Sequence, residues 1–411
     1  MSMSEESSSS RRLMKTLNNN TYFSEDLWLQ IFPYFRLNVI FKFKCVSRVW
    51  NFHLSSPNLI YKWIQFNADN TTLPWILVYI FKQKHLRKFS IAYLESHSPY
   101  ISNHNGFSFE FLNGNPNSSS YSTLYFLGSS NGLVLCLRNT FHYVCNPLTH
   151  KWVQLPPTPH QDDSERLSTL TGFVCDCFTF PTTSYKVVRI PPWHRDSNKF
   201  SIQVFSSDLG KWNLYEVYCP EGVNLRFPKG ASDLIIHNNV LYWIHHSSIV
   251  AYNLENNESE LRQCRLIDLP DRGNGSTRCL RESNGSIFYA RIKMREKTLC
   301  VWVLQEENFH LFHSSIDLHD LFADMVIQIR ADLNGSRWRR DIVKVFGFDP
   351  VDSNVVMIGY KHYIWAYNTG TRKYDELCHP FFLGNPHSAF DVVYLPLVLK
   401  VMPTVLPPRS W

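Results

Sequence analysis

The spacing of apolar residues changes once along the chain, close to Lys88. Before that point, in residues 22–66, apolar side chains recur every three or four positions, as they do on one face of a helix. After it, short apolar runs alternate with turns rich in Asn, Gly, Pro and Ser, a pattern typical of β-strands. We therefore predict an α+β multidomain protein, with a small all-α unit at 22–66 and a mainly-β unit at 88–396.

The helical unit is predicted to contain three or four short helices. Ser24 is placed to cap the first, and Ser56-Pro57 is a good start for the last. Between them the apolar positions at helical spacing include Leu27, Ile31, Ile40, Phe43, Val46 and Trp50. A unit this small cannot turn all of these side chains inward, so we expect a partner to complete its surface.

Three local patterns repeat in the mainly-β unit. An Asn-rich turn followed by an apolar strand occurs at Leu127–Cys136, Ile236–Trp243 and Glu282–Tyr289. A Gly-aromatic pair, a turn and a β-branched strand occur at Gly172–Val188 and Gly347–Met357. A polar turn ending on an aromatic residue occurs at Asn146–Trp152, Ser207–Trp212 and Asn368–Tyr374.

The central strands of these repeats lie about 45–70 residues apart, which is typical of four-stranded propeller blades with loop insertions. We predict a propeller of about six blades. The weakest would lie at 88–127, with strands at Phe89–Tyr93 and Phe107–Phe111. No long amphipathic helix is expected after Lys88. Residues 1–21 are predicted to be disordered, 67–87 to form a linker, and 397–411 to be an irregular tail.

Residues 22–66 resemble an F-box. The matching positions are Asp26-Leu27, Ile31-Phe32, Phe35, Val39-Ile40, Phe43, Val46-Ser47 and Trp50. The family's usual Leu-Pro is Tyr22-Phe23 here, its Pro after the first helix is Arg36, and its common Val-Cys is Val46-Ser47. The resemblance implies a Skp-type adaptor, and through it a cullin, as partners. The residues implied to bind the adaptor are Leu27, Ile31, Phe32, Phe35, Val39, Ile40, Phe43, Val46 and Trp50.

The mainly-β unit resembles the kelch-like, F-box-associated domains of plant proteins. The resemblance rests on Ser129–Leu135, Asn146–Trp152 with Leu155-Pro156, and Tyr185–Val188, while the paired glycines of a regular kelch repeat are missing. Together the two resemblances imply a non-catalytic substrate-recognition subunit of a Skp–cullin–F-box ubiquitin ligase, whose propeller binds a target protein. Three alternatives remain: residues 22–66 brace the propeller as a helical cap, the propeller is an interaction scaffold outside a ligase, or it is an enzyme or a small-molecule receptor.

Loops on a rigid scaffold commonly carry recognition, so the target-binding candidates are two aromatic and basic insertions. One contains Trp193, His194 and Arg195. The other contains Trp338, Arg339 and Arg340. We expect each to project from one end of the propeller.

Composition and charge narrow the function further. The net charge is +6 and the basic residues are scattered, which does not favour a nucleic-acid partner. No apolar run reaches the roughly 18–20 residues of a membrane span, and no secretory signal opens the chain. The ten cysteines therefore indicate free thiols and an intracellular protein of the nucleus, the cytoplasm or both.

Metal or cofactor chemistry is not indicated by the sequence. Cys175 and Cys177 have no second pair at finger-like spacing, and no catalytic motif of a hydrolase, nucleotide-binding protein or zinc protease is found. His245 and His246 follow a strand and are expected to face opposite sides of it. We predict no cofactor and no enzymatic activity of this chain itself.

Overall fold

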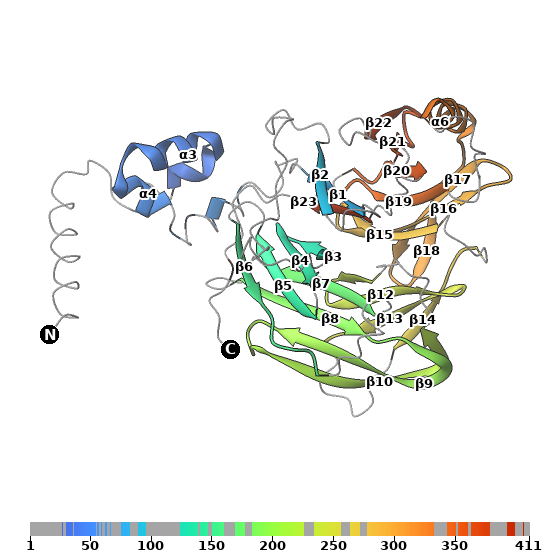
Figure 1. Cartoon of the computed structure of the whole chain (residues 1–411), viewed down its shortest axis with the longest axis horizontal. Helices are drawn as coiled ribbons and strands as arrows, with labels where there is room; N and C mark the ends of the chain where they lie inside the picture. Colours follow the sequence, from blue (N-terminus) through green and yellow to red (C-terminus); the bar gives the residue numbers. More distant parts are fainter. Residues whose placement is uncertain are drawn as a thin grey trace. The chain divides into compact units, whose positions relative to one another are not determined.

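The structure is a computed structural model of the 411-residue chain. It describes residues 27, 30–35, 37–54, 56, 59, 62–63, 66, 75–82, 89–95, 124–138, 140–146, 150–159, 169–176, 183–225, 234–255, 264–271, 278–332, 343–350, 352–360, 363–378, 393–398 and 406. Two compact units are found, residues 1–72 with 178–182 and residues 73–177 with 183–411. Each is described by itself below (Figure 1).

The first unit is helical. Its elements are η1 (Phe32–Tyr34), α3 (Leu37–Val46) and α4 (Arg48–Leu54), and residues 27, 30–31, 59, 62–63 and 66 are also helical. Ser47 caps α4, because its Oγ accepts a hydrogen bond from the Trp50 N–H at 3.1 Å. Ser56 Oγ likewise accepts from the Leu59 N–H at 3.4 Å, at the predicted start of the last helix. The buried core of the unit is Phe32, Ile40, Leu54, Leu59 and Trp63.

The second unit contains five four-stranded antiparallel sheets, each built from consecutive strands. Blade 1 is β3 (Leu124–Ser130), β4 (Leu133–Arg138), β5 (Phe141–Asn146) and β6 (Lys151–Gln154). Blade 2 is β7 (Leu170–Asp176), β8 (Ser184–Ile190), β9 (Trp193–Ser206) and β10 (Lys211–Leu225). Blade 3 is β11 (Ile235–His237), β12 (Val240–His245), β13 (Ser248–Asn253) and β14 (Arg265–Asp268).

Blade 4 is β15 (Arg278–Ser283), β16 (Ser286–Lys293), β17 (Thr298–Gln305) and β18 (Asn308–Asp317). Blade 5 is β19 (Val343–Phe348), β20 (Val355–Tyr360), β21 (Tyr363–Asn368) and β22 (Tyr374–Cys378). The first strands of neighbouring blades contact one another, from β3 to β7, β11, β15 and β19, which is the arrangement of a propeller (Figure 1). The mainly-β propeller is therefore confirmed, but with five blades rather than the six predicted.

The predicted weak blade is instead a three-stranded sheet that joins distant parts of the chain. It consists of β1 (Trp75–Lys82), β2 (Phe89–Glu95) and β23 (Val393–Val398), in the order β2-β1-β23. Because β23 contacts β3 and β2 contacts β22, this sheet lies between blades 1 and 5 and closes the ring. The predicted linker 67–87 thus contains a strand, and β23 runs into the predicted tail. The expected strand at 107–111 and the predicted disordered segment 1–21 lie outside the described residues.

The hairpins predicted from Asn-rich turns are confirmed. They are β3–β4, β11–β12 and β15–β16, and each begins with the innermost strand of its blade. Asn131, Asn238 and Asn284 have positive φ angles of 48°, 48° and 44°. Among residues with a side chain, Asn tolerates this backbone region best, which explains its recurrence at the three turns.

The structure contains one long helix that we did not predict, α6 (His319–Asp332), between β18 and β19. Its buried residues Leu321, Phe322 and Met325 follow the helical spacing that starts at Leu318. The signal was present but was obscured by the strand patterns on both sides. No helix among the described residues is long and apolar enough to cross a membrane.

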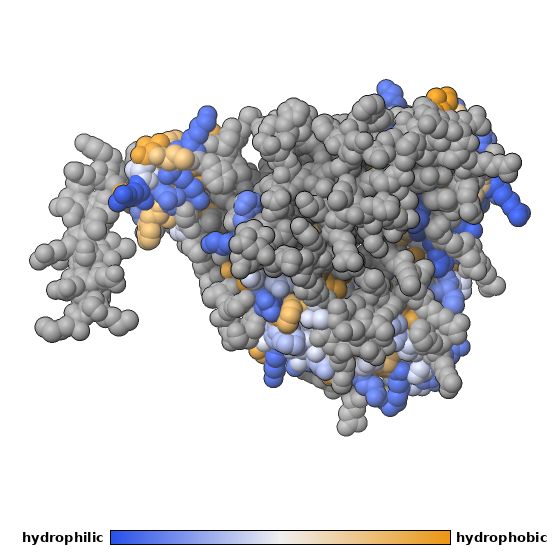
Figure 2. Space-filling model, in the orientation of Figure 1, coloured by the Kyte–Doolittle hydropathy of each residue, from blue (hydrophilic) through white to orange (hydrophobic). Residues whose placement is uncertain are grey.

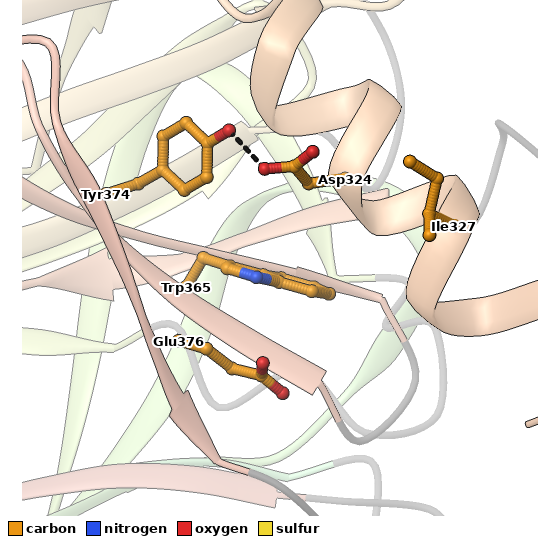
Figure 3. A pocket seen from close by; sticks show the side chains of 5 residues that line it. All are labelled: Asp324, Ile327, Trp365, Tyr374 and Glu376. Carbon is orange, nitrogen blue, oxygen red and sulfur yellow. Dashed lines mark hydrogen bonds between the residues drawn. The ribbon is translucent and has the colours of Figure 1, made fainter. Parts of the chain in front are cut away.

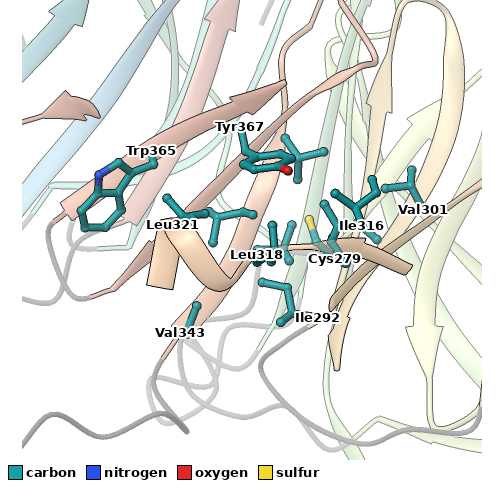
Figure 4. Packing of buried hydrophobic residues seen from close by; sticks show 14 of the residues in the cluster. Cys279, Ile292, Val301, Ile316, Leu318, Leu321, Val343, Trp365 and Tyr367 are labelled. Atoms are coloured by element: carbon teal, nitrogen blue, oxygen red, sulfur yellow. The ribbon is translucent and has the colours of Figure 1, made fainter. Parts of the chain in front are cut away.

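Apolar clusters lie between neighbouring blades. The one between blades 4 and 5 contains Cys279, Ile292 and Val301 from blade 4, together with Leu318 just before α6 and Leu321 in its first turn (Figure 4). Similar clusters join blades 1 and 2, 2 and 3, and 3 and 4. Burial of apolar surface between blades therefore fixes the ring, and it anchors α6 against blades 4 and 5.

Candidate functional site

The residues expected to bind an adaptor divide into exposed and buried groups. Leu27 and Val46 are 41% and 71% exposed. Phe32 and Ile40 are 2% and 0% exposed, so in this unit they pack inward and present no surface to a partner. The remaining members, which are half-buried, are Ile31, Phe35, Val39, Phe43 and Trp50.

An aromatic cluster explains this division. The Phe32 ring contacts the rings of Phe35, Phe43 and Trp50 at centroid distances of 5.6, 6.2 and 5.9 Å. Trp63 adds a hydrogen bond from Nε1 to the Phe35 carbonyl at 2.9 Å. These aromatic side chains therefore build the core of the unit and fix the helices on which the exposed residues sit.

Sequence reasoning missed three exposed apolar residues of the same unit. Tyr34, Phe52 and Phe66 are 70%, 64% and 47% exposed, and the Tyr34 and Phe66 rings lie 4.5 Å apart. These three lie outside the F-box pattern, unlike the exposed Leu27 and Val46, which we call the helical-unit surface. Apolar surface is visible next to hydrophilic residues over α3 and α4 (Figure 2). An exposed apolar group of this kind on so small a unit is typical of an interaction site.

The inner strands of the propeller enclose a pocket of about 600 Å³. We call it the inner-strand pocket. Residues of β3, β7, β11 and β15 line it, and so do Asn131, Asn238, Gly285 and Pro350. Because these four residues lie at the turns after the innermost strands, the pocket is at the end of the propeller where each blade makes its first hairpin. Its volume is within the roughly 300–1,000 Å³ range of ligand pockets.

Two glycines let the inner strands approach closely at this pocket. A Cβ on Gly172 would lie 2.9 Å from Leu234 Cδ2, and one on Gly128 would lie 3.2 Å from the Phe173 Cβ. Hydrogen bonds also join blades 1 and 2 here, since Ser130 Oγ accepts from the Cys175 N–H at 3.0 Å. The wall of the pocket is therefore tightly packed rather than adaptable.

The polar side of the pocket carries charges of both signs, from Arg281 and Glu282. His237 Nδ1 lies 3.4 Å from Glu282 Oε1, and Asn238 Nδ2 lies 3.0 Å from His237 Nε2. The Asn238 amide nitrogen can donate to His237 Nε2, and His237 Nδ1 faces Glu282. Apolar walls with a few fixed polar groups are typical of a ligand-binding pocket.

The two predicted target-binding insertions are not both described. Trp193 opens β9 instead of lying in a loop, and its Nε1 donates to the Val223 carbonyl at 2.7 Å. Its ring stacks on Phe200 at 4.8 Å. Trp193 is therefore fixed by blade 2, while His194 and Arg195 are described only as members of β9. Trp338, Arg339 and Arg340 lie outside the described residues.

The adjacent histidines differ from the expectation of opposite faces. The His245 and His246 rings are 4.4 Å apart, because His246 is in a turn with a φ of 49°. Burial, and then the neighbouring His246, lower the pKa of His245 to about 4. Among the described residues no group of three or more His, Cys, Asp and Glu side chains could hold a metal ion.

Comparisons with known proteins concern mainly the propeller. A family model described as "F-box protein At3g26010-like, beta-propeller" matches residues 108–369. F-box protein At3g26010 of Arabidopsis thaliana is 26% identical over 336 residues, covering 76% of this chain and 72% of that protein. An F-box/kelch-repeat protein of the same plant, At4g22430, is 28% identical over 204 residues, which is 45% of each chain.

Solved structures resemble the chain only distantly. The extracellular domain of the one component system BT4673 from B. thetaiotaomicron aligns with a TM-score of 0.34 and 14% identity, over 63% of this chain and 28% of that one. A TM-score this low carries no argument about activity.

Proposed function

This chain belongs to the F-box protein At3g26010-like β-propeller family, whose model matches more than half of it, and on that premise we propose a function. The chain is the substrate-recognition subunit of a Skp–cullin–F-box ubiquitin ligase, acting in the nucleus, the cytoplasm or both. Its helical unit binds a Skp-type adaptor, and its propeller binds a target protein. The chain itself performs no catalytic step: it raises the effective concentration of the target near the ubiquitin-loaded enzyme.

The observation that carries the proposal is the apolar surface of the helical unit. Leu27 and Val46 match the F-box pattern and are also exposed, which distinguishes them from the buried Phe32 and Ile40. We assign adaptor contact to Leu27 and Val46, with Ile31, Val39, Phe35, Phe43 and Trp50 at the edges of the contact. Phe32 and Ile40 support the helices from within.

Target binding is assigned to the inner-strand pocket. A rigid wall and fixed polar groups favour recognition of one segment over many, because little conformational freedom is lost on binding. Arg281 and Glu282 both line the pocket and can pair with charged groups of a bound segment. Trp193 is a weaker candidate, since its indole N–H and its ring already have partners within blade 2.

The adaptor contact is tested by coexpression with a Skp-type adaptor and pull-down. Full burial of one aliphatic side chain contributes about 1.5–3 kcal/mol, so Val46→Asp should weaken binding by roughly tenfold or more. The matched control is Tyr34→Asp: Tyr34 is 70% exposed against 71% for Val46, in the same unit, but lies outside the F-box pattern. We expect the control to copurify like the wild type.

Three results would each contradict the proposal as stated. Soluble, folded wild-type chain that fails to copurify with any adaptor paralogue would leave a propeller scaffold outside a ligase. Equal loss of adaptor copurification with Val46→Asp and Tyr34→Asp would mean that the F-box residues do not determine the adaptor contact. Loss with Tyr34→Asp alone would place it on another face.

A further inference from the structure

A second pocket, of about 370 Å³, lies between α6 and blade 5 (Figure 3). Asp324 and Ile327 line it from α6. Trp365 lines it from β21, and Tyr374 and Glu376 line it from β22. We call it the α6 pocket. It shares no lining residue with the inner-strand pocket.

On the blade side of the pocket, the pairing of β21 with β22 determines which side chains line it. Trp365 on β21 is the cross-strand partner of Glu376 on β22, so the two side chains lie on the same face of the blade. Tyr374 is two residues before Glu376 and shares that face, and its ring stacks on Tyr367 at 6.2 Å. One face of blade 5 therefore presents aromatic rings beside a carboxylate.

Helix α6 places the other side. Its buried Leu321, Phe322 and Met325 fix it against the cluster between blades 4 and 5. Asp324 and Ile327 are three residues apart and share the helix face that borders the pocket. Asp324 Oδ2 accepts a hydrogen bond from the Tyr374 hydroxyl at 2.6 Å, which joins helix and blade at the pocket (Figure 3).

The electrostatic environment of the pocket is negative. Burial, followed by the hydrogen bond to Asp324 and the charges of Asp324 and Asp320, raises the pKa of Tyr374 to about 12. Asp320 lies one helical turn before Asp324, and Glu376 adds a carboxylate from the blade. An anionic ligand would be repelled here, and a wholly apolar one would have to desolvate these carboxylates without compensation.

The mouth of the pocket is apolar. Ile327 is 68% exposed, although it lies on a helix that is anchored on its other face. Apolar surface is also visible over α6 (Figure 2). An aliphatic chain can therefore lie along Ile327 while a cationic end reaches the carboxylates and the aromatic rings, which attract cations.

We infer that the α6 pocket binds a lysine or arginine side chain of a partner polypeptide, with its aliphatic stem on Ile327 and its charge beside Asp324 and Glu376. This site is separate from the adaptor contact and from the inner-strand pocket. The inference does not depend on the proposed ligase function. It would hold equally for a propeller scaffold that recognises basic segments.

The test uses the full chain and blocked amino acids, N-acetyl-lysine-methylamide and N-acetyl-arginine-methylamide, in ligand-observed NMR titrations. The blocked norleucine analogue has the same stem without the charge and should bind about tenfold more weakly than lysine. Raising the salt concentration should weaken the binding of the two cationic probes and leave the binding of norleucine unchanged. If blocked norleucine binds as tightly as blocked lysine, the inference is overturned.

Two near-isosteric variants separate charge from folding. Glu376→Gln and Asp324→Asn should each weaken lysine binding by about three- to tenfold, and the asparagine oxygen can still accept from Tyr374. The control is Asp208→Asn, which removes one carboxylate from the β9–β10 turn of blade 2. Unchanged affinity in both pocket variants would contradict the site. Binding of free n-butylammonium without binding of blocked lysine would contradict a polypeptide source.

Discussion

His142 should make the propeller acid-sensitive. It lies on β5, is 4% exposed, and its ring packs 5.9 Å from that of Trp212. Burial, and then the positive charge of Arg189, lower the pKa of His142 to about 3. In the unfolded chain the same imidazole has a pKa of about 6.5. Between these values the unfolded chain takes up a proton that the folded chain does not.

The sign and size of the effect follow from this difference. Because the folded-state pKa is lowered, His142 does not affect stability above pH 6.5. As the pH falls from 6.5 towards 3, protonation of the unfolded chain progressively lowers the free energy of unfolding. Between pH 7.5 and 5.0, protonation of this imidazole stabilises the unfolded chain by about 2 kcal/mol, because pH 5.0 lies about 1.5 units below the unfolded pKa. Protonation of His142 alone should therefore remove a substantial fraction of the stability of a typical domain.

The assay is urea unfolding of the full chain at pH 7.5 and pH 5.0, followed by tryptophan fluorescence, for wild type and His142→Gln. Any pH-independent cost of the substitution cancels in the difference between the two pH values. Other groups, such as His245, titrate in both proteins and cancel as well. We expect the variant to lose about 2 kcal/mol less than the wild type. Equal losses in the two proteins would refute the reasoning.

Three further substitutions test the packing and turn assignments. Asn284→Val should lower the free energy of unfolding by about 1–2 kcal/mol in urea titration, because residue 284 has a φ of 44°, whereas Asn284→Gly should be nearly neutral. Ile40→Ala, at a site with 0% exposure, should destabilise the helical unit by about 2–5 kcal/mol and speed its limited proteolysis, whereas Val46→Asp should not. Ser283→Ala removes the hydrogen bond from Ser283 Oγ to the Asp349 carbonyl, which joins blades 4 and 5, and should cost about 1 kcal/mol in the same titration.

Local turn chemistry explains why much of the propeller could be predicted. Asn131, Asn238 and Asn284 each mark a hairpin by themselves, because a two-residue turn with positive φ restricts the residues that can occupy it. The ring closure could not be predicted in this way. Strand β1 pairs with β23 from the opposite end of the unit, and pairing between such distant segments leaves no local signal in either of them.

The surface that we propose for adaptor binding could be predicted only in part. Helical spacing and the F-box pattern identify which residues are apolar, but not which of them another helix covers. Phe32 and Ile40 are covered and Val46 is not, and for Phe32 this depends on how Trp50 packs against it. The same reasoning applies to α6. Its apolar spacing shows a buried face, whereas the α6 pocket depends on which blade that helix packs against.

The central claim is that one chain connects a ligase scaffold to a target. Its most direct test is sedimentation velocity of the purified full chain mixed with a Skp-type adaptor and a cullin amino-terminal domain. The account predicts a single species that contains all three proteins, and its loss when the chain carries Val46→Asp but not Tyr34→Asp. A chain that sediments alone beside a preformed adaptor–cullin pair would contradict the account.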